Sequence, residues 1–143
     1  MNTAGVPPEG YKVVGDLVAT HTLQFDSQAD AESIVMELLT SHTPDVPIVD
    51  TQGHLEGIVG ELEILKALQE GRDLTQVKAR DLMKKEKPIQ VTDGTPISDA
   101  LKLLQKEHMS IVPVVRENRV IKSITRHDII RAMSGAGLGV EKL

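Results

Sequence analysis

The chain has 143 residues, a formal net charge of −5 and 40% hydrophobic residues, a balance typical of globular rather than disordered proteins. An acidic pI near 5.5 and only two aromatic residues argue against a nucleic-acid surface, which needs positive charge and stacking platforms. The absence of cysteine excludes disulfides and thiolate metal sites, and no apolar run approaches the roughly 18 residues of a membrane span. We therefore expect a cytoplasmic protein that binds neither nucleic acid nor membranes.

The first half of the chain predicts a strand, a helix, a hairpin and a second helix. A short strand is expected at Leu23–Phe25, and the arms of the hairpin at Val46–Val49 and Leu55–Val59, on either side of a polar turn. Both helices are amphipathic, because their apolar residues recur at helical spacing. The residues that set these two patterns are Ala31, Ile34, Val35 and Leu38, followed by Leu62, Leu65 and Leu68.

The same order returns after a linker at residues 71–78. A strand is expected at Ile89–Val91, then a helix capped by Thr95 with Pro96 at its first position. A second hairpin is expected at Ile111–Val115 and Val120–Ile124. The apolar residues of the two helices in this half are Ile97, Ala100, Leu101 and Leu104, followed by Ile129, Ile130 and Met133.

The two halves are copies of one unit. Asp16 and Leu17 recur as Asp81 and Leu82 (81 − 16 = 65), and the recurrence continues to the end of each half. We take residues 11–74 and 75–134 as two repeats with the order β-α-β-β-α, which predicts an α+β fold. One repeat has too few helices to cover its sheet, so we expect the two repeats to pack against each other.

This duplicated pattern resembles the CBS domain. The matching stretches are the opener Asp81–Met83, the strand Val112–Val115 and the junction Ile124–Ile130, in this order. The resemblance implies a tandem pair, or Bateman module, with pseudo-twofold symmetry and clefts that bind AMP, ADP, ATP or S-adenosylmethionine. It also implies a homodimer and a non-catalytic regulatory role toward a partner protein whose identity the residues do not indicate.

The strongest candidate site is the junction between the last strand and the last helix of repeat 2. A helix N-terminus offers unpaired N–H groups and partial positive charge to a phosphate. Thr125 adds a hydroxyl and Arg126 a charged fork for phosphate, and His127 either contacts the phosphate or lies on the solvated face of the helix. Asp128 is an acceptor for ribose hydroxyls, which matches the family pattern of a Thr followed three residues later by an Asp. The same pattern is typical of a capping box, and both interpretations stay open.

We expect adenine to lie in the cleft of the same repeat, with its edge bonded to backbone groups and its faces against aliphatic side chains. The alternative is that these segments are simply core strands. Lys122 stands where the family usually has a glycine, and it either crowds the site or adds positive charge. The residues expected around adenine are Ile89, Gln90, Ser110, Val112 and Pro113.

The first repeat departs from this pattern. Its junction has Gly60 in place of the Thr and Glu63 in place of the Asp, and Glu56 and Glu61 make the mouth more acidic. Negative charge repels phosphate, so we expect a weaker second site that is empty or selective for a less charged ligand, such as a nucleoside or S-adenosylmethionine. The residues of this weaker site are Gly60, Glu63, Leu23, Val46 and Pro47.

The remaining residues predict no catalysis. His42 and His108 align across the repeats near the ends of their helices, where a structural role at the helix dipole is expected. Metal-ligand spacing, a nucleophile elbow and a phosphate loop are all absent from the sequence. We expect no enzyme activity and no required cofactor or metal, with Mg²⁺ entering only if the ligand is ATP. The alternatives are a structural dimerisation or scaffold pair with decayed sites, and an S-adenosylmethionine-binding module.

Overall fold

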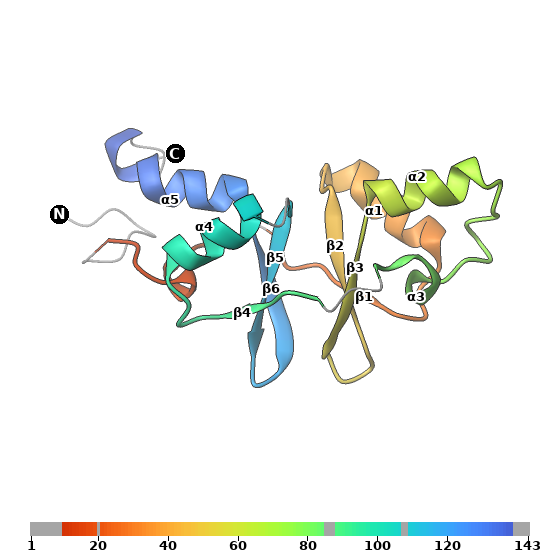
Figure 1. Ribbon diagram of the computed structural model, residues 1–143, viewed down its shortest axis with the longest axis horizontal. Helices are drawn as coiled ribbons and strands as arrows, with labels where there is room; N and C mark the ends of the chain where they lie inside the picture. The colour runs from red at the N-terminus through yellow and green to blue at the C-terminus, as the bar shows by residue number, and fades with distance from the viewer. Residues whose placement is uncertain (1–9, 20, 85–87, 107–108, 139–143) are drawn as a thin grey trace. The chain divides into compact units, whose positions relative to one another are not determined.

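The computed structural model describes residues 10–138 apart from residues 20, 85–87 and 107–108. It confirms the α+β class, with two three-stranded sheets in the orders β1-β2-β3 and β4-β5-β6 (Figure 1). The elements are η1 (Val14–Asp16), β1 (Phe25–Asp26), α1 (Ala31–Ser41), β2 (Asp45–Val49), β3 (Leu55–Gly60), α2 (Glu61–Gln69), α3 (Ala79–Leu82), β4 (Val91–Thr92), α4 (Ile97–Lys106), β5 (Ile111–Arg116), β6 (Arg119–Thr125) and α5 (Arg126–Leu138).

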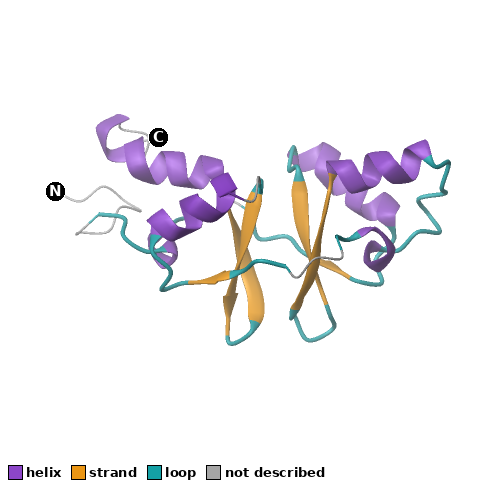
Figure 2. Ribbon diagram, in the orientation of Figure 1, coloured by secondary structure: helices purple, strands orange, loops and turns teal. Residues whose placement is uncertain are grey.

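Both sheets are built in the same way. β1 runs parallel to β2, with Phe25 opposite Ile48, and β4 runs parallel to β5, with Val91 opposite Val114. A helix crosses over between the two strands of each parallel pair, as parallel strands require. The third strand returns through a short turn, and the helices cover one face of each sheet (Figure 2).

The two hairpin turns differ in length. The β2–β3 turn is the longer one and has Gly53 at φ 88°, a left-handed conformation that glycine adopts without strain. The β5–β6 turn has only two residues, Glu117 and Asn118, at φ 52° and 66°. Two consecutive left-handed residues match the twist of the flanking strands, which is why this short loop closes the hairpin.

The chain divides into two compact units that do not follow chain order. The repeat-1 unit comprises Leu23–Ile89 and Glu117–Val120, and the repeat-2 unit comprises the chain up to Thr22, Gln90–Arg116 and the chain from Ile121. Each unit has its own aliphatic core. The repeat boundaries predicted at residues 11–74 and 75–134 stay a prediction about the sequence.

Each unit includes a short segment that comes just before the other unit's repeat along the chain, and we call it the lead-in segment. The segment around η1 packs on the repeat-2 unit, where Val14 N donates to Thr95 O at 2.8 Å and Leu17 enters the core. The segment around α3 packs on the repeat-1 unit, where Ala79 N donates to Ala29 O at 2.8 Å and Leu82 enters the core. The repeats are therefore interleaved, and the sequence analysis did not predict this exchange.

The helical patterns of α1 and α4 are confirmed. Ala31, Ile34 and Leu38 are buried, with Val35 packed against them. The corresponding face of α4 is also buried, through Ile97, Ala100 and Leu104, with Leu101 packed against it.

The expected packing face of α2 is wrong. Leu62, Leu65 and Leu68 are more than half exposed, whereas Ile64 and Ala67 face the core. A spacing of three residues predicts a helix, but it does not decide which of two apolar sides of that helix packs against the core. In α5, likewise, Ile129 is buried while Ile130 and Met133 are exposed.

Two local expectations also need correction. The first strand of each sheet lies one or two residues later than expected, at Phe25–Asp26 and Val91–Thr92, so Leu23 is left exposed before β1. Thr95 is not the cap of α4, because its hydroxyl accepts the N–H of Thr92 at 3.1 Å. No helix within the described residues has the length and apolarity needed to cross a bilayer.

Candidate functional site

The last strand of repeat 2 continues directly into the last helix. β6 ends at Thr125 and α5 begins at Arg126, so Thr125 holds the N-cap position. Asp128 donates its N–H to Thr125 Oγ1 at 3.1 Å, and Thr125 donates its N–H to Asp128 Oδ2 at 3.0 Å. These reciprocal bonds form a capping box, so that interpretation of the Thr-x-x-Asp pattern is confirmed.

The capping pair is almost wholly buried. Thr125 is 8% and Asp128 2% exposed, and Asp128 Oδ1 lies 3.7 Å from Arg131 Nη1. The nearby guanidinium compensates a carboxylate that burial alone would destabilise. Thr125 Oγ1 accepts one bond and keeps its own proton for donation. A ligand that bonds to these groups has to displace part of the packing around them.

A buried hydroxyl lies beside this pair. Ser123 is 1% exposed, and its Oγ has no hydrogen-bond partner within the described part of the chain. Because strand side chains alternate, Ser123 and Thr125 lie on the same face of β6. An unsatisfied buried hydroxyl costs about 1–3 kcal/mol, so this face carries a donor that a polar group from outside the chain can satisfy.

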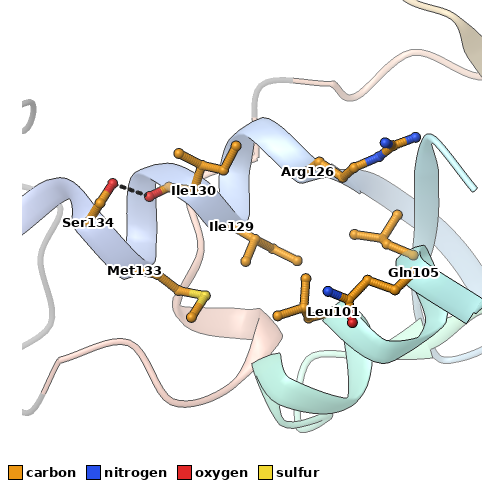
Figure 3. Close-up of a pocket in the computed structure, with 8 residues that line it drawn as sticks. Leu101, Gln105, Arg126, Ile129, Ile130, Met133 and Ser134 are labelled. Atoms are coloured by element: carbon orange, nitrogen blue, oxygen red, sulfur yellow. Dashed lines mark hydrogen bonds between the residues drawn. The ribbon is translucent and has the colours of Figure 1, made fainter.

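The two polar residues between the members of the capping pair are exposed. Arg126 and His127 both lie on the first turn of α5. Arg126 also lines an apolar groove of about 400 Å³ between α4 and α5, at the end next to the sheet (Figure 3). Leu101 and Gln105 line the groove from α4, and Ile129 and Met133 from α5.

The expected adenine segments are only partly brought together. The parallel register of Val91 with Val114 places Gln90 beside Pro113, at the point where β4 begins. Gln90 is exposed, Ser110 half-buried and Pro113 buried.

Two other residues of this set lie elsewhere. Val112 points its side chain into the repeat-2 core, so only its backbone is available to a ligand. Ile89 is half-buried and belongs to the repeat-1 unit.

Lys122 does not crowd the face that carries Ser123 and Thr125. Its neighbour Ser123 points to one side of β6, so Lys122 points to the other. Its Nζ lies 3.5 Å from Leu17 O and 3.9 Å from Asp93 Oδ1. Arg116 also contacts Asp93, with Nη2 to Oδ2 at 2.8 Å. Lys122 therefore helps to hold the lead-in segment on the repeat-2 unit.

The equivalent junction of repeat 1 keeps only half of the capping box. Gly60 is the N-cap of α2, and Glu63 Oε1 accepts its N–H at 2.8 Å. Gly60 lies opposite Asp45 on β2, and a Cβ at Gly60 would collide with the Asp45 carboxylate. A carboxylate thus takes the space of the missing threonine side chain, and it adds to the acidic character predicted from Glu56 and Glu61.

The other residues of the weaker site lie on β2 and just before β1. Val46 and Pro47 belong to β2, whereas Leu23 precedes β1, whose Phe25 pairs with Ile48. Val46 is 2% exposed and belongs to the repeat-1 core, Pro47 is buried, and Leu23 is exposed. The side chain of Leu23 is therefore accessible at this edge, whereas that of Val46 is not.

The described histidines form no metal site. Across the described residues, no group of three or more His, Asp or Glu side chains could hold a metal ion. His42 is the C-cap of α1 at φ 55°, an exposed position at the helix end. His108, its predicted counterpart, lies outside the described residues.

Comparison with known proteins explains the duplicated pattern. The family profile of the CBS domain matches residues 14–70 and 79–135, which together are well over half of the chain. The chain belongs to the CBS domain family. It carries two CBS domains in tandem, as the resemblance implied.

Relatives of this CBS domain pair include uncharacterized protein MJ1225 of Methanocaldococcus jannaschii, which is 23% identical over 120 residues. The match covers 84% of the chain but only 42% of that protein, so the chain spans less than half the length of this relative.

Solved structures share the fold. The structure of CBSX2 in complex with AMP is 23% identical, with a TM-score of 0.73 over 90% of this chain and 99% of that one. The CBS domain pair of protein MJ0100, in complex with 5′-methylthioadenosine and S-adenosyl-L-methionine, is 26% identical, with a TM-score of 0.73 over 87% and 97%.

The sequence analysis missed two residues of these junctions. Ser123 was not predicted as a ligand-binding residue, although its polarity within an apolar strand end was a usable signal. Asp45 carried no signal, because only the pairing of β2 with β3 brings it to Gly60.

Proposed function

We propose that this CBS domain pair is a non-catalytic regulatory module that binds an adenine nucleotide mainly in repeat 2, at the start of α5. Thr125 and Asp128 bond to the ribose and phosphate, Arg126 and His127 contact the phosphate, and Ile89, Gln90, Ser110, Val112 and Pro113 surround the adenine. No metal is required unless the ligand is ATP with Mg²⁺. The module acts as a homodimer on a partner protein, at a cytoplasmic location.

The observation that carries this proposal is the buried polar face at the end of β6. Ser123 and Thr125 both have a hydroxyl proton there, and the Ser123 hydroxyl has no partner within the described residues. An apolar residue at position 123 would avoid the cost of an unsatisfied group, so a polar ligand gives the serine a function. The AMP bound to CBSX2 and the adenosyl ligands bound to the MJ0100 pair support an adenosyl compound as that ligand.

The expected affinity is modest. At roughly 0.3 kcal/mol per heavy atom, the about 23 heavy atoms of AMP correspond to about −7 kcal/mol. This free energy equals a Kd on the order of 10 μM, which suits a sensor of an abundant nucleotide. Displacing packed side chains from Thr125 and Asp128 lowers the affinity further.

The weaker site of repeat 1 is expected to discriminate against phosphate. The Asp45 carboxylate fills the position of the missing side chain at Gly60, and Glu63 already accepts the Gly60 N–H. We therefore expect this site, with Leu23, Val46 and Pro47, to be empty or to take a nucleoside or S-adenosylmethionine.

A specific observation also favours a second function, that of a structural dimerisation module with decayed sites. The capping box satisfies its own groups and is almost wholly buried, as in a helix start that has no ligand. Calorimetric titration with AMP, ADP, ATP and S-adenosylmethionine separates the two functions. Saturable binding of one of these compounds supports the sensor, and heat no greater than dilution at millimolar ligand supports the scaffold.

Variants then test the site. Thr125→Ala with Asp128→Ala removes the hydroxyl and the carboxylate, and we expect at least a tenfold weaker Kd. Asp128→Asn keeps an oxygen that can accept the Thr125 N–H, so it separates the effect on binding from the effect on the cap. Asp73→Ala with Thr75→Ala is the matched control, because it removes the same residue types and a similar bond, from the Thr75 N–H to Asp73 Oδ1 at 3.0 Å, in an exposed turn. Unchanged binding in the Thr125 and Asp128 double variant would refute the site.

A further inference from the structure

The lead-in segment of the repeat-2 unit is held beyond η1 by two long hydrogen bonds to its backbone. Lys122 Nζ lies 3.5 Å from Leu17 O, and Arg131 Nη1 lies 3.4 Å from Val18 O. Both distances exceed the roughly 2.7–3.2 Å of a strong N–H···O bond, so each contact is weak. The Val18 side chain is 58% exposed. Val18 is therefore held by its carbonyl and not by burial of its side chain.

The equivalent position of repeat 1 is held by an apolar side chain. Met83 corresponds to Val18 (83 − 65 = 18), and it packs against the repeat-1 core. Gly57 makes room for this packing, because a Cβ at Gly57 would collide with the Met83 side chain. Repeat 2 has Lys122 in place of Gly57 (122 − 65 = 57). The two differences together replace an apolar anchor by polar contacts that are easier to break.

The arginine that contacts Val18 also contacts the carboxylate of the candidate site. The same nitrogen, Arg131 Nη1, lies 3.4 Å from Val18 O and 3.7 Å from Asp128 Oδ1. Arg131 follows Asp128 by three residues, so both lie on one side of α5. The carboxylate is fully buried and the arginine side chain is 32% exposed, so the arginine is the partner with room to move.

A ribose that bonds to Asp128 competes with this arginine. Asp128 Oδ2 accepts the Thr125 N–H at 3.0 Å and so holds the start of α5. Oδ1 is therefore the oxygen that can change its partner at the smaller cost to the cap. Because one nitrogen of Arg131 serves both Oδ1 and the Val18 carbonyl, drawing it away from the carboxylate also draws it away from Val18.

We propose that Arg131 couples nucleotide binding to the repeat-2 lead-in segment, because a nucleotide that bonds to Asp128 displaces the guanidinium and releases Val18. Arg131 is a positioning residue in this coupling and not part of the contact with the nucleotide. The chain passes into the repeat-1 unit a few residues later, at Leu23, so the release loosens a connection between the two units. The inference rests on the proposed function, since it needs a nucleotide at Asp128.

A spin label at Val18 tests the release directly. The chain has no cysteine, so Val18→Cys carries a single nitroxide, and the exposure of this position directs the label into solvent. Millimolar AMP, ADP, ATP and S-adenosylmethionine are added in turn, and the compound that binds in calorimetry should shorten the rotational correlation time of the label about twofold. Leu39→Cys, at a 70% exposed position on α1, is the control and should not respond. A Val18 label that is unchanged at saturation would overturn the coupling.

A change at Arg131 tests whether this residue carries the signal. Arg131→Met keeps most of the side-chain length and removes the donor, so the Val18 label should be mobile without nucleotide and should respond no further when nucleotide binds. Lys66→Met is the matched control, because Lys66 is the exposed equivalent in repeat 1 (131 − 65 = 66) and its loss should leave the label as in the native chain. A label that stays restrained in Arg131→Met would refute the role of Arg131.

Affinity provides a test that does not depend on the folding of the Arg131 variant. If binding has to release Val18, weakening the hold on the adjacent residue favours binding by the same coupling. Lys122→Met removes the contact with Leu17 O from the face of β6 opposite Thr125, and we expect an AMP Kd about threefold lower. Lys102→Met removes the same charge from an exposed position on α4 and should leave the Kd unchanged. An equal or higher Kd for Lys122→Met would contradict the competition.

Failure of this inference differs from failure of the proposed function. Calorimetric binding with a silent Val18 label overturns the coupling and leaves the nucleotide sensor in place. Absence of binding for all four compounds refutes the sensor and the coupling together.

Discussion

The starts of α2 and α5 occupy the same position in the two repeats, and in both the N-cap N–H bonds to an acidic residue three positions later, yet the rest of their chemistry differs. At α5, Thr125 and Asp128 exchange two hydrogen bonds and are buried. At α2, Gly60 has no side chain, and the Asp45 carboxylate takes the space that a side chain would need. Duplication thus preserved the backbone plan while the chemistry of the two junctions diverged, one with an ordered polar cap and one with an acidic mouth.

The two lead-in segments, in contrast, pack on their units in equivalent ways. Truncating the buried leucine of either segment should have the largest effect on the free energy of unfolding. Leu17→Ala and Leu82→Ala should each destabilise the protein by about 2–5 kcal/mol, because each truncates a side chain that is buried in the core of its unit. Urea unfolding measures both changes. Val18→Ala, at a 58% exposed position, serves as the control and should stay within about 0.5 kcal/mol. If Leu17→Ala were as stable as Val18→Ala, the packing of the η1 segment on the repeat-2 unit would be contradicted.

The crowded junction of repeat 1 can be tested by adding a single methyl group. Gly60→Ala should destabilise the protein by about 1–3 kcal/mol, because the new Cβ forces the Asp45 carboxylate out of its place. Asp45→Ala in the same chain should recover most of this loss. A double-mutant cycle on thermal unfolding measures the coupling, and additive effects of the two changes would show that Asp45 does not occupy this space.

The two caps should differ in their contribution to stability. Asp128→Ala should cost about 1 kcal/mol or somewhat more, because it removes a buried cap and leaves the Thr125 N–H without its acceptor. Glu63→Ala should cost less, since Gly60 lacks the other half of the box and Glu63 is only half-buried. Chemical unfolding of the two variants side by side checks the order, and an equal or reversed cost would contradict it.

The smallest effect concerns acid stability. Hydrogen bonds from the Val13 and Lys12 backbone N–H groups lower the pKa of Asp16 below its usual value of 3.8. A carboxyl whose pKa is lower in the folded state contributes stability above the unfolded-state pKa and loses it as the pH falls through the folded-state value. With Asp16→Asn, the free energy of unfolding should therefore fall less steeply as the pH drops below about 4. Urea midpoints from pH 6 to pH 3 measure this slope, and an unchanged slope would rule out the contribution.

The sequence predicted the elements well because each depends on neighbours along the chain. Alternating and helical spacings, turn residues and the 65-residue recurrence establish the order β-α-β-β-α twice, and the CBS resemblance rests on three short motifs within that order. The Thr125–Asp128 capping box was also foreseeable, since both its bonds span three residues. Such local signals need no knowledge of what the chain contacts elsewhere.

Other features depended on contacts between distant residues, and the tertiary structure alone decided them. The exposure of Leu65 depends on which side of α2 meets β3 and α1, a choice that two apolar sides of one helix leave open. The burial of Leu17 in the same core as Val91 and Ile97 joins residues more than 70 positions apart, and no local pattern predicts it. Asp45 reaches Gly60 only through the strand register. Short-range preferences determined the elements, and long-range packing determined which of their faces are covered and which remain exposed.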